Sequence, residues 1–131
     1  MAIYGPYLAR VIKFHDGDTI HFDIDLGFDH MIMGQDWKGK PRLSCRVFGI
    51  NAPELITKAG KVSLAFAQTL LKPGDICKVS SHGWDKYGGR FDGTVIMPDG
   101  RDFAKVMLAA GQAVAMKSKA VKTTRAASRE D

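Results

Sequence analysis

Apolar and polar residues alternate along several short segments of the chain, and this pattern is typical of strands that bury one face. The alternation predicts strands over residues 7 to 14, 20 to 25, 41 to 50, 75 to 81 and 89 to 96. Residues 29 to 40 mix methionine, tryptophan and glycine without a sustained period. They therefore predict a long connection, or the extension of a hairpin.

Two segments have apolar residues at spacings of three and four, which predicts helices with one buried face. The first covers residues 58 to 71 and is closed by Lys-Pro-Gly, and the second begins near Phe103 and ends at Gly111. Three strands, a helix, two strands and a helix do not form the regular alternation of a parallel doubly wound sheet. The order predicts a mainly β (α+β) fold, a five-stranded antiparallel barrel with two packed helices.

The length of 131 residues and the hydrophobic content of 45% predict one compact domain. We assign residues 1–116 to this domain and residues 117–131 to a basic C-terminal tail. The N-terminus has no basic leader followed by an apolar run, and no apolar window approaches the length of a membrane span. We therefore expect a cytoplasmic monomer with no membrane association and no obligate protein partner, unless a secretory leader has been removed.

The net charge of +5 favours an anionic partner, although many basic proteins have none. Residues 117 to 129 contribute five cationic side chains and no acid. This segment is either a solvated tail or an arm that attracts phosphates. Cys45 and Cys77 each fall in an expected strand, so we expect buried free thiols in preference to a disulfide, and two cysteines cannot form a zinc site by themselves.

The histidines show no spacing that pairs them on one metal, and we expect each to lie at the surface or in a turn. They are His15, His21, His30 and His82. The segment Asp-Ile-Asp-Leu-Gly-Phe-Asp superficially resembles a calcium loop, but it lacks the distal glutamate, and strand alternation explains its spacing.

The segment His-Asp-Gly-Asp-Thr at residues 15 to 19 has two interpretations. Asp-Gly is a common hairpin turn, and a structural role is sufficient for it. Asp18, however, follows the turn and opens a strand, where a turn does not need an acid. A rigid strand end is a good place to present a hard oxygen ligand to a cation.

Two further segments combine charged groups with bends. Arg-Val-Phe-Gly-Ile-Asn-Ala-Pro-Glu places Arg46 on the less apolar face of a strand and then presents Asn51 and Glu54 around a proline, although an isolated glutamate is usually only a solvated charge. Asp-Lys-Tyr-Gly-Gly-Arg suits a loop that closes over a phosphate, or equally a glycine-rich hairpin. Together the three segments contain the groups that cleave a phosphodiester: a cation site, arginines for the phosphoryl oxygens and a carboxylate for water.

These three motifs, in this order and with a helix between the last two, resemble the staphylococcal nuclease (thermonuclease-like) family from about Val11 to Ala115. The resemblance implies an OB-type five-stranded barrel and Ca²⁺-dependent endonuclease hydrolysis of DNA or RNA. It implies metal ligation by Asp18, by Asn51 and by the backbone carbonyl of Ala52. The remaining implied roles are transition-state contacts from Arg46 and Arg90, a general base or water-positioning group in Glu54, and phosphate contacts from Lys86 and Tyr87.

The chain departs from the family pattern at several positions. Asn51 stands where the family usually has an aspartate, which removes a negative charge and predicts weaker Ca²⁺ binding or a preference for another divalent cation. The loop contains an extra glycine before Arg90, and a small displacement of that arginine would cost a large factor in rate. The segment after the second helix lacks the tyrosines on which the family stacks a base. The alternative function is therefore a nucleic-acid-binding OB module that does not cut.

Overall fold

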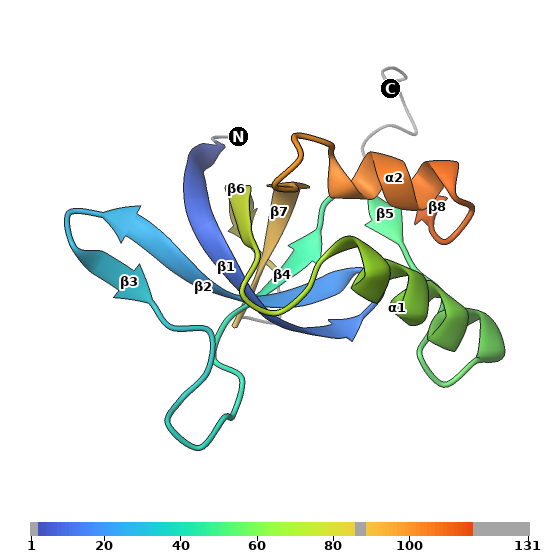
Figure 1. Ribbon diagram of the computed structural model, residues 1–131, viewed down its shortest axis with the longest axis horizontal. Helices are drawn as coiled ribbons and strands as arrows, with labels where there is room; N and C mark the ends of the chain where they lie inside the picture. The colour runs from blue at the N-terminus through green and yellow to red at the C-terminus, as the bar shows by residue number, and fades with distance from the viewer. Residues whose placement is uncertain (1–2, 86–88, 117–131) are drawn as a thin grey trace.

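The computed structural model describes residues 3–85 and 89–116. These residues form eight strands and two helices (Figure 1). The elements are β1 (Tyr4–Asp16), β2 (Thr19–Gly27), β3 (His30–Ile32), β4 (Ser44–Val47), β5 (Ile50–Asn51), α1 (Lys58–Leu70), β6 (Ile76–Trp84), β7 (Arg90–Ile96), α2 (Phe103–Ala109) and β8 (Val114–Ala115). The predicted basic tail, residues 117–131, lies outside the described residues.

Five of the strands close into a barrel in the order β1, β6, β7, β4, β2 and back to β1. This confirms the predicted mainly β fold with an OB-type barrel. The prediction that all pairings are antiparallel is wrong at one place, because β4 and β7 run parallel. In a closed ring of five strands the directions cannot alternate all the way round, so at least one neighbouring pair must be parallel.

The inward faces of the strands form the core, as the alternation predicted. Cys45 and Val47 of β4 are buried, as are Ile20 and Phe22 of β2. The two cysteines are free and buried, in agreement with the expectation, and burial raises the pKa of both thiols. They therefore remain protonated and unreactive at neutral pH.

The two helices lie on the same side of the barrel (Figure 1), α1 against β1 and α2 against β7. Helix α1 is capped at its N-terminus by Thr57, whose hydroxyl accepts a hydrogen bond from the N–H of Gly60 at 2.9 Å. Helix α2 is capped by Asp102, whose carboxylate accepts from the N–H groups of Ala104 and Lys105. Both helices end within two residues of the predicted positions, because side-chain caps and glycine are local features.

Two short pairings were not predicted. Strand β8 pairs with β5 and joins the segment after α2 to the segment that contains Asn51. Strand β3 extends the β2 hairpin through a turn in which Phe28 and Asp29 both have positive φ. The hairpin of β2 and β3 projects away from the barrel, and the loop after β3 projects beside it (Figure 1). The interpretation of residues 29 to 40 as an extended hairpin and connection is confirmed.

The expectation that every histidine lies at the surface or in a turn is wrong for His21, which is buried. Strand β2 pairs with β1 along one edge and with β3 and β4 along the other, so both of its edges are covered, and the ring of His15 on β1 lies 6.3 Å from that of His21. Gly34 packs directly on the backbone of Phe22, and its N–H donates to Asp23. Alternation predicted an exposed polar face on β2, but the following loop covers part of it.

Candidate functional site

Asp18 lies in the tight turn between β1 and β2, and its carboxylate is held from two sides. One oxygen accepts a hydrogen bond from the Ala52 N–H at 2.8 Å, and the other accepts from the Thr19 hydroxyl at 3.2 Å. Gly17 beside it has no room for a Cβ atom, because Ser63 of α1 and Ala52 pack against the turn. The turn is therefore a rigid part of the fold and presents Asp18 to the segment after β5.

Arg46 reaches this carboxylate from the adjacent strand β4, where it pairs in register with Thr19. One guanidinium nitrogen of Arg46 lies 3.8 Å from the Asp18 carboxylate, and the side chain is only 15% exposed. The guanidinium also donates to the Ile50 carbonyl at 3.3 Å and to the side-chain oxygen of Asn51. Four of the predicted site residues, Asp18, Arg46, Asn51 and Ala52, are thus brought together.

The environment of Asp18 makes its charged form costly. Burial raises the pKa of Asp18 to about 6, and the hydrogen bond and charge of the neighbouring Asp16 carboxyl add to the rise. The Ala52 N–H and the Arg46 guanidinium act in the opposite direction and are outweighed. A buried carboxylate beside a second carboxylate is stabilised by a cation, and Arg46 supplies only part of that compensation.

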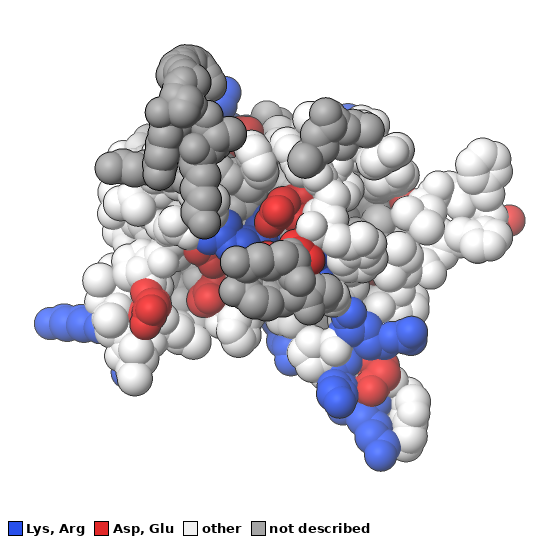
Figure 2. Space-filling view, turned by 180° about the vertical axis from the view of Figure 1, so that it is seen from behind, with Lys and Arg blue, Asp and Glu red and all other residues white. Residues whose placement is uncertain are grey.

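Arg90 lies at the start of the neighbouring strand β7. Its side chain is on the outer face of the barrel formed by β4 and β7, the face that also carries Arg46. In the parallel pairing Arg90 is opposite Ser44 and Asp92 is opposite Arg46, while the residues between them face the core. Two contacts to the Asp85 carboxylate, 3.2 Å from Nε and 2.9 Å from Nη2, hold the Arg90 guanidinium, which is 31% exposed. Figure 2 shows basic and acidic side chains side by side near the centre of a face of the molecule.

Glu54 lies two residues beyond Ala52, and the structure anchors its backbone more firmly than its side chain. The Glu54 carbonyl accepts hydrogen bonds from the N–H and the hydroxyl of Thr57, at 2.9 and 2.6 Å. Gly60 of α1 packs so closely on this carbonyl that a Cβ atom would not fit. The Glu54 carboxylate is exposed and makes no hydrogen bond within residues 3–85 and 89–116. The other two predicted contacts, Lys86 and Tyr87, lie outside the described residues.

The oxygen atoms of this cluster are of the type that binds a hard divalent cation, but only one of the three donor groups, the Asp18 carboxylate, carries a negative charge. The Asp18 carboxylate, the Asn51 amide oxygen and the Ala52 carbonyl are the donor types that Ca²⁺ prefers. Across the described part of the chain, no group of three or more His, Cys, Asp or Glu side chains is placed to hold a metal ion. The Asn51 oxygen also accepts a hydrogen bond from Arg46, which uses one of its two lone pairs and places a cationic group beside the site where a metal ion would bind.

Two partner residues were not singled out from the sequence. Asp16 is not one of the predicted metal ligands. Its carboxyl nevertheless accepts a hydrogen bond from the Asp18 N–H at 3.1 Å and raises the pKa of Asp18. Asp85 orients Arg90. Both acids stand within the motifs Asp-Gly-Asp and Asp-Lys-Tyr-Gly-Gly-Arg, so the clustering of charges there was the available clue.

Comparison with known proteins gives no family: no protein-family model matches the chain, and no curated protein sequence matches it at a significant level. Among the described residues, no helix combines the length and the apolar character needed to cross a bilayer.

Proposed function

We propose that this protein is a divalent-metal-dependent endonuclease that hydrolyses phosphodiester bonds of DNA or RNA with broad specificity. The observation that supports this most is the meeting of Asp18 with Arg46, with Arg90 on the adjacent strand of the same outer face. A phosphodiester in hydrolysis gains negative charge on its non-bridging oxygens, and guanidinium groups fixed on strands stabilise that charge. The resemblance to the staphylococcal nuclease family remains part of this proposal.

In this proposal Asp18, Asn51 and the Ala52 carbonyl would hold a Ca²⁺ ion, or another divalent cation because Asn51 replaces a carboxylate. Such a cation would supply positive charge at the phosphate and would lower the pKa of water. The pKa of Asp18, raised to about 6, is consistent with a carboxylate that gains from a nearby cation.

The side chains divide the remaining work. Arg46 and Arg90 bind the non-bridging oxygens, for which Arg46 releases Asn51 and Arg90 releases Asp85. Glu54 orients a water molecule and accepts its proton as the water oxygen bonds to phosphorus; the bond to the leaving oxygen breaks, and solvent protonates that oxygen. The exposure of Glu54 keeps its carboxylate accessible to substrate and water.

A second candidate is a nucleic-acid-binding module of the same fold that does not cut. It is favoured by the hydrogen bond between Arg46 and Asn51, which places a guanidinium charge against an oxygen that the enzyme would need as a metal ligand. An OB barrel with a basic surface binds nucleic acid strands without any metal.

A cleavage assay separates the two candidates. Plasmid DNA and a structured RNA are incubated with the protein and Ca²⁺, Mg²⁺ or Mn²⁺, or with chelator, and fragments are measured. The enzyme proposal expects fragments with at least one cation, none with chelator, and a loss of about 100-fold or more in Glu54→Gln. Asp29→Asn, an exposed acid at the hairpin tip, is the matched control and should cleave normally. Strand binding without fragments in any metal would support the binding module instead.

A further inference from the structure

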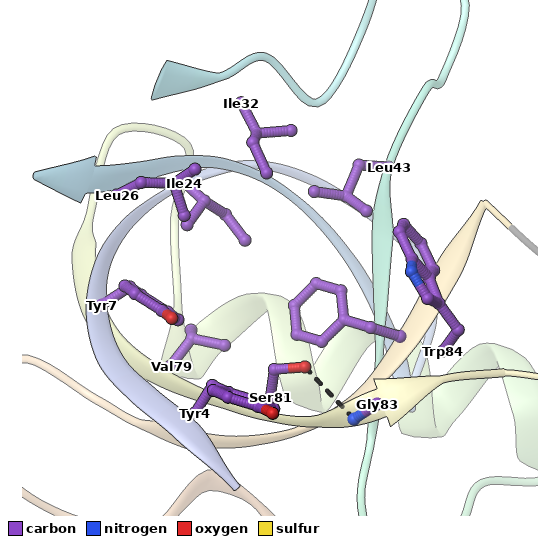
Figure 3. Close-up of a pocket in the computed structure, with 11 residues that line it drawn as sticks. Tyr4, Tyr7, Ile24, Leu26, Ile32, Leu43, Val79, Ser81, Gly83 and Trp84 are labelled. Carbon is purple, nitrogen blue, oxygen red and sulfur yellow. Dashed lines mark hydrogen bonds between the residues drawn. The ribbon is translucent and has the colours of Figure 1, made fainter. Parts of the chain in front are cut away.

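A second concave site lies at one end of the barrel, inside the ring of strands (Figure 3). This end pocket has a volume of about 290 Å³ and is lined by aliphatic side chains together with four aromatic ones, Tyr4, Tyr7, Trp84 and Phe91. None of the described residues that line it carries a charge. The volume is at the lower end of the range of about 300 to 1,000 Å³ for small-molecule sites, so it suits one ring system.

The side chains of the described residues that line the end pocket offer few polar atoms, and most of these lack a partner within the described residues. The hydroxyls of Tyr4 and Tyr7 and the indole N–H of Trp84 make no hydrogen bond to the described part of the chain. The Ser81 hydroxyl accepts a hydrogen bond from the Gly83 N–H at 3.2 Å and also faces the pocket (Figure 3). Aromatic faces with free donors and acceptors suit a flat ring that has polar atoms on its edge.

The end pocket and Arg90 share the ends of the same strands. Trp84 of β6 pairs with Phe91 of β7, and both side chains line the pocket. The residues adjacent to these two in the chain form an ion pair at 2.9 Å: Asp85 follows Trp84 directly after the end of β6, and Arg90 precedes Phe91 at the start of β7. A molecule with an anionic group at Arg90 and a flat ring could therefore reach over the barrel rim into the pocket.

We propose that the end pocket binds the base of a nucleotide whose phosphate is held at Arg90. This rests on the proposed function, because it takes the anion at Arg90 to be a nucleic acid phosphate. The positive charge of Arg90 beside an uncharged aromatic pocket matches the two parts of a nucleotide, and stacking on aromatic rings accepts any base. Trp84 is 68% exposed at the edge of the pocket and is the main stacking surface.

The test is a double-mutant cycle between protein and strand. Single-stranded trinucleotides are compared with trinucleotides that have an abasic sugar at each position in turn, and dissociation constants are measured by fluorescence anisotropy. All proteins contain Glu54→Gln so that substrate survives in the presence of Ca²⁺. Trp84→Ala should weaken binding of the intact strand about tenfold, and should have no effect when the base that occupies the pocket is missing.

Two further variants guard against an effect on folding. Ser81→Phe places a ring inside the end pocket and should give the same loss as Trp84→Ala, with an unchanged circular dichroism spectrum. Trp37→Ala is the matched control, because it removes the other tryptophan, which is highly exposed and does not line the pocket. It should change the affinity for intact and abasic strands by the same factor.

The outcomes distinguish this inference from the function on which it rests. Equal effects of Trp84→Ala on intact and on all abasic strands would overturn the base pocket while leaving the nuclease proposal standing. Coupling between Trp84 and one base, in a protein that cleaves nothing in any metal, would support the pocket and overturn the nuclease. If a fluorescent apolar dye fills the pocket and nucleosides do not displace it, the site is one for apolar ligands, and the base proposal fails.

Discussion

The Asp18–Arg46 pair and the Asp85–Arg90 pair lie on the same outer wall of the barrel, but the fold holds them in different ways. The first joins a turn, strand β4 and the segment after β5, and both side chains are largely buried. The second joins residues five apart in one hairpin; Asp85 is 11% exposed, as Asp18 is, but Arg90 is 31% exposed. Barrel closure therefore determines the position of Arg46, whereas a local partner determines that of Arg90.

The difference predicts how each arginine responds to substitution. Removal of Arg46 should affect both stability and activity, because it leaves a buried carboxylate without its cation. Removal of Arg90 should affect activity and lower stability less than removal of Arg46 does. The Asp85 side chain is as buried as that of Asp18, at 11% exposed, but Arg90 is 31% exposed, so water already reaches its guanidinium and screens the pair. The following predictions test this contrast.

The largest effect is expected for Arg46→Ala. Cleavage should fall about 1,000-fold, since the group that stabilises the phosphoryl oxygens is lost. The free energy of unfolding at pH 8 should fall by about 2 kcal/mol, less than for a fully buried pair because the contact between Arg46 and Asp18 is 3.8 Å long. Initial cleavage rates and urea denaturation measure the two quantities. Arg101→Ala, an exposed arginine paired with Asp99, is the control and should change neither.

A smaller effect is expected for Arg90→Ala. Cleavage should fall about 100-fold while the free energy of unfolding changes by less than about 1 kcal/mol. The same two assays apply. If Arg90→Ala lowered the free energy of unfolding as much as Arg46→Ala does, the proposed difference between an arginine positioned by barrel closure and one positioned within a hairpin would be wrong.

Asn51→Asp should restore a negative charge to the cluster. Calcium affinity, measured by isothermal titration calorimetry, should rise about tenfold, because carboxylates bind Ca²⁺ more strongly than amides do. Glu54→Asp leaves the number of carboxylates unchanged and serves as the comparison. Unchanged calcium affinity in Asn51→Asp would mean that the new carboxylate forms a salt bridge with Arg46 and that residue 51 is not a metal ligand.

The smallest effect concerns pH. The pKa of Asp18 is about 6 in the folded chain against an ordinary value of 3.8, so the folded state binds the proton more tightly than the unfolded state does. The contribution of Asp18 to stability therefore becomes less favourable as pH rises from about 4 to about 6, and is constant above that. In chelator, the melting temperature of Asp18→Asn relative to wild type should rise by a few degrees between pH 4 and pH 7.5.

The matched control for this pH dependence is Asp29→Asn, because Asp29 is exposed at the hairpin tip. Its melting temperature should follow that of the wild type at both pH values. A difference between Asp18→Asn and wild type that stays constant with pH would contradict the raised pKa of Asp18.

Most of the secondary structure could be predicted from local patterns. Helix α1 was expected over residues 58 to 71 and covers Lys58–Leu70, because its apolar spacing and its Thr57 cap are encoded within a few residues. Strand β8 was missed because two residues show no period, and its partner β5 is distant in the chain. The burial of His21 was missed because alternation within β2 says nothing about side chains of the neighbouring strand, such as His15 of β1, whose ring centroid lies 6.3 Å from that of His21.

The sequence by itself determined the elements, the two-faced strands, the free buried cysteines and the residue types near the candidate site. These depend on side-chain polarity and on contacts between near neighbours. Only the tertiary structure decided that Arg46 meets Asp18, that Asn51 accepts a hydrogen bond from Arg46, and that an aromatic pocket opens one residue away from Arg90. Those relations depend on strand register and barrel closure, which bring together residues that no local pattern connects.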